Sequence, residues 1–127
     1  MTWAANYIGQ PWISGEADCW AFARRVWREQ FGWVVPAVDV DALKPLATMR
    51  EFRDNPEYAN WTSVDTPRDG DAVLMSKSSR AGHVGVWADA DGGGILHSVQ
   101  SAGVVFTPPA RLSGMGLRVL AYYRRLI

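Results

Sequence analysis

The 127-residue sequence contains a single cysteine, which excludes an intramolecular disulfide and leaves one free thiol. Histidine is also scarce, with only His83 and His97. No apolar run approaches the roughly 18 residues needed to span a bilayer, so membrane insertion is not expected. Thirteen basic residues balance thirteen acidic ones. This lack of net charge removes the long-range attraction on which nucleic-acid binding depends, so no nucleic-acid partner is expected.

The first twelve residues have no basic segment, no long apolar segment and no small-residue cleavage site, and so predict no secretory signal. We therefore expect synthesis in a cytoplasm, with any action outside following lysis or delivery by a larger assembly. Apolar residues make up 48% of the chain and charged residues 20%, as in ordinary globular proteins. The length suits one core, so residues 1–127 are expected to form a single domain.

The pattern of apolar residues predicts helices first and strands afterwards. Helices are expected over residues 2–9, from Cys19 to about residue 31, and over residues 43–52. Asp18 is a suitable N-cap for the second helix, whose apolar residues share one face. Five runs are typical of strands: residues 71–75, 83–88, 94–100, 104–107 and 117–123, with a hairpin connection at residues 89–93. This order indicates an α+β domain in which N-terminal helices pack on an antiparallel sheet of about five strands.

Cys19 is a candidate nucleophile because the start of a helix stabilises a thiolate through the helix dipole and unpaired amides. On this ground we expect the pKa of Cys19 to be lower than that of an ordinary thiol. His83 and His97 fall in two strands that the hairpin would pair, so their imidazoles can be neighbours. In such a site His83 would take the thiol proton, His97 would orient His83, and the Cys19 amide would supply an oxyanion donor.

Other interpretations of these three residues remain open at this stage. Cys19 taken alone fits a small buried apolar residue, and each histidine taken alone fits a hydrogen-bonded structural role. The three side chains could also bind zinc, although their spacing differs from that of typical zinc ligands. Asp89 and Asp91 resemble part of a calcium loop, but the later ligands are missing and a turn is expected. No metal and no cofactor are therefore predicted.

Five motifs follow one another along the chain: Gln10-Pro11-Trp12, Asp18-Cys19, Gly70-Asp71-Ala72-Val73-Leu74, His83-Val84-Gly85-Val86-Trp87 and Leu96-His97-Ser98. Together they resemble the NlpC-type family of cell-wall cysteine peptidases over nearly the whole chain. The resemblance implies a papain-like core in which Cys19 is the nucleophile, His83 the base and His97 the third member of a triad. It also implies hydrolysis of the peptidoglycan stem peptide after D-glutamate, with substrate contacts from the residues near these motifs, namely Trp12, Asp18, Trp20 and Gly82.

Residues 26–32 and 101–106 resemble segments of phage tail-associated members of that family, which are small proteins without signal peptides. This likeness implies phage tail-tip partners, a place in the virion, and local wall digestion that helps DNA into the cell. The chain departs from the family pattern in having Trp12 where tyrosine is common, a short loop before Cys19, and Trp20 after it. Two alternatives remain: a structural tail-tip or tail-assembly component, and an amidase or acyltransferase that uses the same triad.

Overall fold

The computed structural model describes residues 3–13, 18–36, 56–77 and 80–126. In chain order the elements are η1 (Trp3–Asn6), α1 (Cys19–Phe31), η2 (Pro56–Asn60), β1 (Trp61–Val64), β2 (Ala72–Lys77), β3 (Arg80–Ala88), β4 (Gly94–Val99), β5 (Gly103–Thr107), η3 (Pro109–Met115) and β6 (Leu117–Arg125). The η elements are 3-10 helices. The predicted α+β class is confirmed, with six strands in the described residues where about five were expected. The helix expected over residues 43–52 lies outside the described residues.

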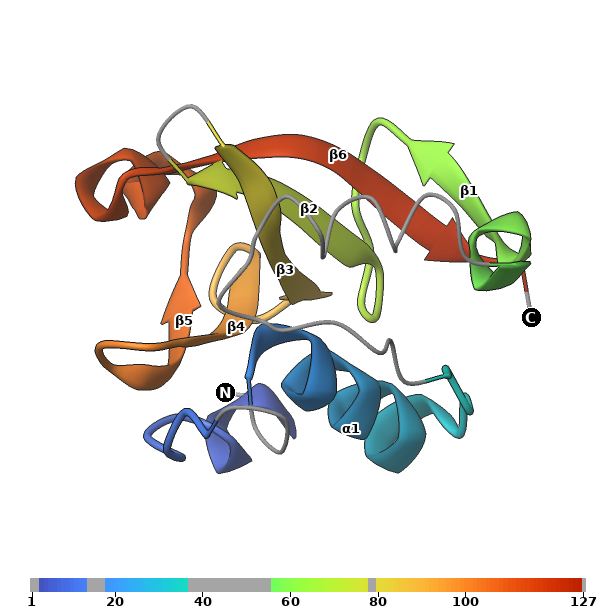
Figure 1. Cartoon of the computed structure of the whole chain (residues 1–127), viewed down its shortest axis with the longest axis horizontal. Coiled ribbons are helices and arrows are strands. Elements are labelled where there is room, and N and C mark those ends of the chain that lie inside the picture. Colours follow the sequence, from blue (N-terminus) through green and yellow to red (C-terminus); the bar gives the residue numbers. More distant parts are fainter. Residues whose placement is uncertain (1–2, 14–17, 37–55, 78–79, 127) are drawn as a thin grey trace.

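The six strands form one antiparallel sheet in the order β1-β6-β2-β3-β4-β5. The strands from β2 to β5 follow one another both along the chain and across the sheet. The last strand, β6, then returns to lie between β1 and β2, and Figure 1 shows it as the long strand that crosses the structure toward the C-terminus. The strand β1 was not expected from the sequence, because the strand it pairs with among the described residues, β6, is more than fifty residues further along the chain.

The helix α1 packs on the sheet at β3 and β4 (Figure 1). Asp18 caps its start, and Gly32, with a φ of +71°, ends it in the left-handed conformation that favours glycine. Of the apolar face predicted for α1, Phe22, Ala23, Val26 and Trp27 are buried, and Phe31 is partly buried. They form one core with Val84, Val86 and Leu96 of the sheet. A second core holds Trp87 and Ile95 together with Leu112 of η3.

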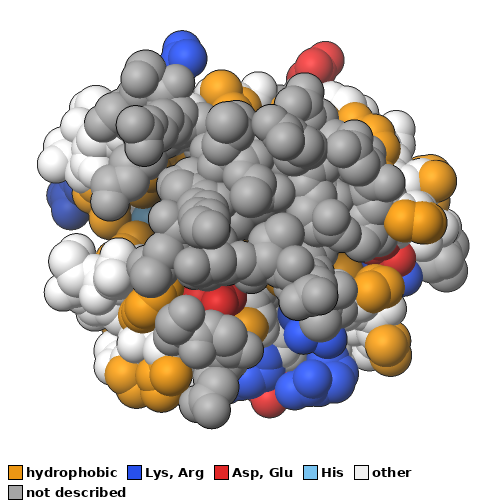
Figure 2. All heavy atoms as spheres, viewed as in Figure 1, with side chains coloured by type: hydrophobic (Ala, Val, Ile, Leu, Met, Phe, Trp, Pro, Cys, Tyr) orange, Lys and Arg blue, Asp and Glu red, His pale blue; other side chains and the backbone are white. Residues whose placement is uncertain are grey.

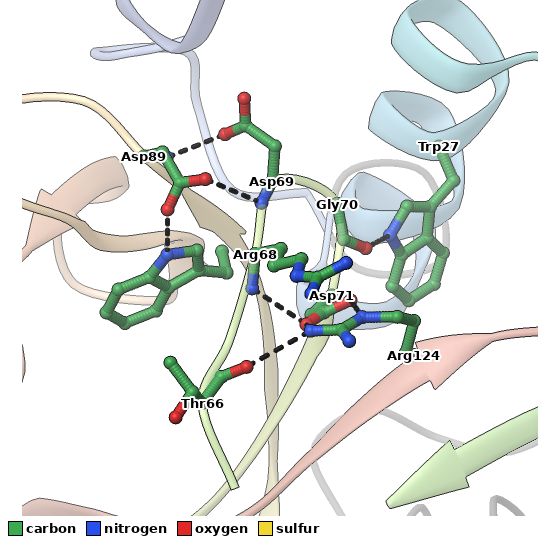
Figure 3. A network of polar contacts seen from close by, with 9 residues as sticks. Trp27, Thr66, Arg68, Asp69, Gly70, Asp71, Asp89 and Arg124 are labelled. Atoms are coloured by element: carbon green, nitrogen blue, oxygen red, sulfur yellow. Dashed lines mark hydrogen bonds and ion pairs between the residues drawn. The ribbon is translucent and has the colours of Figure 1, made fainter. Parts of the chain in front are cut away.

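A polar network fixes the turn that leads into β2 (Figure 3). The buried Asp71 carboxylate accepts hydrogen bonds from the Arg68 amide at 2.8 Å and from Arg124 of β6 at 2.8 and 3.1 Å. The Trp27 indole donates to the Gly70 carbonyl at 2.8 Å, which ties the turn to α1 as well. The turn is thereby anchored to both layers, so the start of β2 has a fixed position.

The N-terminal segment differs from its prediction. Within the described residues 3–9, the 3-10 helix η1 takes the place of the helix expected over residues 2–9, and the chain then turns at Gly9, whose φ is +92°. The Gly9 amide donates to the Val104 carbonyl at 2.9 Å, and the Val104 amide donates to the Gln10 carbonyl at 2.8 Å. Backbone pairing with β5 therefore replaces the last turns of the expected helix.

Basic side chains gather on the edge of the molecule where α1 lies (Figure 2). Arg25 of this helix serves the fold, because its guanidinium lies 5.3 Å from the centre of the Tyr7 ring and donates to the Gln10 side chain at 2.6 Å. Among the described residues, no helix combines the length and the apolar character needed to cross a bilayer.

Candidate active site

Cys19 is the first residue of α1, directly after the residue that caps the helix. The Asp18 carboxylate accepts a hydrogen bond from the Ala21 amide at 2.9 Å, which satisfies one of the unpaired amides of the first turn. The Asp18 N-cap predicted from the sequence is therefore confirmed. It fixes the point from which the thiol projects.

The Cys19 thiol is buried where α1 meets β3. It is 4% exposed, and its sulfur lies within hydrogen-bonding reach of the amide of Val84, the residue that follows His83. Burial raises the pKa of Cys19 to about 11; the Val84 amide acts in the opposite direction, and the Asp18 carboxylate adds to the increase. The expectation of a lowered pKa is thus wrong. Loss of solvent around the sulfur outweighs the helix amides, and that loss comes from tertiary packing.

Gly82 forms a β-bulge immediately before His83. Met75 of β2 is paired with His83 of β3. The next residue of β2, Ser76, is paired with Ala81, so that Gly82 is the extra residue. Its φ of +140° is one that residues with a side chain rarely adopt. A bulge of this kind bends the strand and redirects the side chain beside it, so Gly82 sets the direction of the His83 imidazole.

The two histidines are in direct contact. Nε2 of His83 lies 2.8 Å from Nδ1 of His97, and the rings meet edge to face with their centroids 5.0 Å apart. The expectation that the hairpin brings the two imidazoles together is confirmed. His83 is partly exposed, and Figure 2 shows a small area of histidine surface, whereas His97 is 0% exposed.

The far side of the His97 ring is held by two residues that the sequence analysis missed. Nε2 of His97 lies 3.0 Å from the hydroxyl oxygen of Thr107, and this hydroxyl donates to the sulfur of Met115 at 3.6 Å. Burial lowers the pKa of His97 to about 4, so the ring is neutral near pH 7. Alternation along the paired strands β4 and β5 could have indicated Thr107. Met115 comes from η3, which no strand pattern reveals.

Gly85 makes room for this arrangement. A Cβ atom at this position would lie 2.5 Å from Cγ2 of Ile95 and 3.0 Å from Cβ of His97. Both distances are shorter than ordinary packing allows, so any side chain here would push β4 away from β3. Gly85, the glycine of the His-Val-Gly motif, therefore allows the backbone of β3 to approach His97 of β4.

The two tryptophans expected to contact substrate lie in different environments. Trp20 is 7% exposed and packs edge to face on Trp27, with ring centroids 5.9 Å apart, so its ring is part of the core. Trp12 is half-buried and follows the segment whose Gln10 carbonyl is bonded to Val104 of β5. Of the two, Trp12 has more surface that a ligand could reach.

The groups available for chemistry are one thiol, an imidazole pair and the amides around the sulfur. In the described part of the chain, no three His, Cys, Asp or Glu side chains are grouped so as to hold a metal ion. The domain has a cysteine at the start of its helix and two bonded histidines on adjoining strands. These are the groups that a cysteine hydrolase uses.

The family model described as the NlpC/P60 family matches residues 5–119. The chain belongs to the NlpC/P60 family, whose members are typically cysteine peptidases and hydrolases of the cell wall. No curated protein matches the chain. Family membership thus indicates cell-wall peptidase activity with peptidoglycan as the substrate.

Proposed function

We propose that the protein is a D,L-endopeptidase that cleaves the peptidoglycan stem peptide after D-glutamate, using Cys19, His83 and His97 as a triad. One observation carries the proposal. The sulfur at the start of α1 meets the amide of Val84, one residue from His83, and the ring of His83 is bonded to His97. These contacts support the assignment of Cys19 as nucleophile, His83 as base and His97 as orienting group.

The first step is attack by the thiol. With its pKa raised to about 11, Cys19 is protonated near pH 7, so its proton must leave as the sulfur attacks the scissile carbonyl. Because Nε2 of His83 is bonded to His97, Nδ1 is the nitrogen that receives this proton. His97, which stays neutral, then accepts from Nε2–H and stabilises the imidazolium. The Cys19 amide donates to the oxyanion.

The second step releases the products. His83 returns the proton to the leaving amine, the carbon–nitrogen bond breaks, and an acyl group remains on the sulfur. Water, deprotonated by His83, then attacks this thioester; the carbon–sulfur bond breaks, the carboxylic acid forms, and the sulfur takes the proton back from His83. One water is consumed for each bond cut, and the enzyme regains its starting state.

Substrate contacts are proposed for the residues around this centre. We propose that Asp18, which caps α1 through Oδ1, also receives the amino end of the stem peptide. Trp12 offers an indole N–H and a partly exposed ring, and Gly82 lies at the bulge directly before His83. Trp20 is accounted for by core packing, and we assign it no direct contact with substrate.

The site of action that we propose is the tip of a phage tail, where local wall digestion would help DNA into the cell. The proposal is supported by the resemblance of residues 26–32 and 101–106 to phage tail-associated members of the family. Immunodetection in purified virions tests it. Protein found only in the lysate, and not in the particles, would rule it out.

The enzymatic proposal is tested by incubating purified muropeptides with the wild type and with Cys19→Ala, and reading the products by mass spectrometry. We expect two fragments whose masses sum to the substrate plus one water, with a new carboxyl terminus at D-glutamate, and no cleavage by Cys19→Ala. Thioester transfer to an added amine in place of water would favour the acyltransferase alternative. Identical products from both proteins would favour the structural tail component.

A further inference from the structure

The hydroxyl of Thr107 lies between the His97 ring and the sulfur of Met115. Its oxygen is 3.0 Å from Nε2 of His97 and 3.6 Å from Sδ of Met115. Thr107 is 6% exposed and His97 is 0% exposed, so the protein itself must satisfy these polar groups. A hydroxyl has one proton to donate. The direction of the Thr107 O–H bond therefore determines whether Nε2 of His97 is a donor or an acceptor.

The thioether of Met115 determines the direction of the Thr107 O–H bond. The sulfur of Met115 carries no hydrogen and can only accept, so the contact between them requires the Thr107 hydroxyl to donate. The Thr107 oxygen then presents lone pairs to His97, and Nε2 of His97 must carry the ring's proton. Since the buried ring is neutral, its Nδ1 has no proton and acts as an acceptor.

The tautomer of His97 in turn determines the tautomer of His83. The bond of 2.8 Å between the rings needs one proton, and Nδ1 of His97 cannot supply it. Nε2 of His83 must therefore be the donor, which leaves Nδ1 of a neutral His83 unprotonated. If the hydroxyl turned to His97 instead, every proton in the chain would shift, and a neutral His83 would carry its proton on the nitrogen that must act as base.

We infer that Thr107 and Met115 are positioning residues that set the tautomers of His97 and, through it, of His83. The catalytic consequence rests on the proposed function, but the tautomers are a property of the resting protein. Met115 acts at the third contact from the base, through Thr107 and His97.

The test is long-range nitrogen–proton NMR on protein labelled with ¹⁵N-histidine, near pH 7. Only two imidazoles are present, so assignment is direct. We expect the proton on Nε2 in both rings of the wild type. In Met115→Leu the hydroxyl loses its thioether acceptor and turns to His97, whose proton moves to Nδ1. Thr107→Ser keeps a hydroxyl at this position and should retain the wild-type pattern.

Hydrolysis kinetics provide the second readout. Met115→Leu and Thr107→Val should lower kcat roughly tenfold with little change in KM. In these variants His83 must first change to the tautomer whose Nδ1 is unprotonated before it can act as the base. Thr107→Ser should restore most of the rate. A proton on Nδ1 of His97 in the wild type, or an unchanged tautomer in Met115→Leu, would overturn the inference. If the wild type cleaved nothing, the proposed function would fail while the NMR result still decided the tautomers.

Discussion

His83 and His97 are joined by a side-chain bond of 2.8 Å at a place where their strands are no longer paired. The ladder between β3 and β4 ends at Val86 and Leu96, so both histidines lie beyond it. The imidazole pair thus connects a stretch of β3 and a stretch of β4 that are not paired with each other through their backbones. The contact that orients the base also maintains the local structure, and its loss should affect stability as well as rate.

Stability should decrease in acid because of His97. Its pKa is 6.5 in an unfolded chain and about 4 in the folded protein. Between these values the unfolded state binds a proton at this ring and the folded state does not, so acid favours unfolding. The contribution is fully present above pH 6.5 and is lost as the pH falls to 4, by about 3 kcal/mol. Urea unfolding across this range measures it. His97→Gln should flatten the slope between pH 4 and 6.5, whereas His83→Gln, which leaves the buried ring in place, should keep it.

Alkylation of Cys19 should be slow in the folded protein near pH 7. With its pKa raised to about 11 by burial, the thiolate is scarce, and the rate should rise steeply only in strongly basic solution. Iodoacetamide labelling against pH measures this without ambiguity, since the chain has one thiol. In denaturant the midpoint should return to about 8.5. A folded-state midpoint at or below that value would contradict the burial argument.

Replacing the two histidines should have unequal effects on hydrolysis. His83→Gln removes the proposed base and should lower kcat by roughly 10²–10⁴. His97→Gln keeps an amide oxygen that can accept from His83, so a smaller loss of about tenfold is expected, in line with one weakened polar contact. Steady-state kinetics on muropeptides compare them. Equal losses would mean that His97 does more than orient its neighbour.

Gly85→Ala should destabilise the protein by about 1–3 kcal/mol, because the added methyl group would overlap Ile95 and crowd His97. Gly114→Ala is a matched control, since a Cβ atom there meets nothing within 4 Å. Chemical denaturation of both variants gives the difference. In Gly85→Ala the bond between the histidines should also weaken, with displaced imidazole signals in NMR spectra. A stability close to that of Gly114→Ala would show that β4 can adapt.

Asp18 offers a way to separate capping from substrate binding. Asp18→Ala removes the acceptor for the Ala21 amide and should cost about 1 kcal/mol of stability, whereas Asp18→Ser keeps a capping oxygen. If the carboxylate also binds the amino end of the stem peptide, both variants should show a raised KM. Thermal unfolding and kinetics measured together distinguish the roles. A normal KM in Asp18→Ser would restrict this residue to capping.

The sequence predicted those parts of the site that depend on local patterns. The start of α1 follows from Asp18, and the histidine pair follows from a hairpin that joins two short strands. The pKa of Cys19 was predicted in the wrong direction, because burial depends on how β3 covers the helix. Thr107 and Met115 were missed for a similar reason. Their contact joins β5 to η3 and leaves no periodic trace in the chain.

The N-terminal segment is bonded both to α1, which carries Cys19, and to β5, which carries Thr107. Its Tyr7 hydroxyl donates to Glu29 of α1 at 2.7 Å, and its Gln10 carbonyl accepts from Val104 of β5. The helix with the nucleophile and the strand with Thr107 therefore share one support that contains no catalytic group. A protein that lacks the first ten residues should keep every reactive side chain but lose this support together with the buried Ala4 and Tyr7, so that turnover and stability fall together.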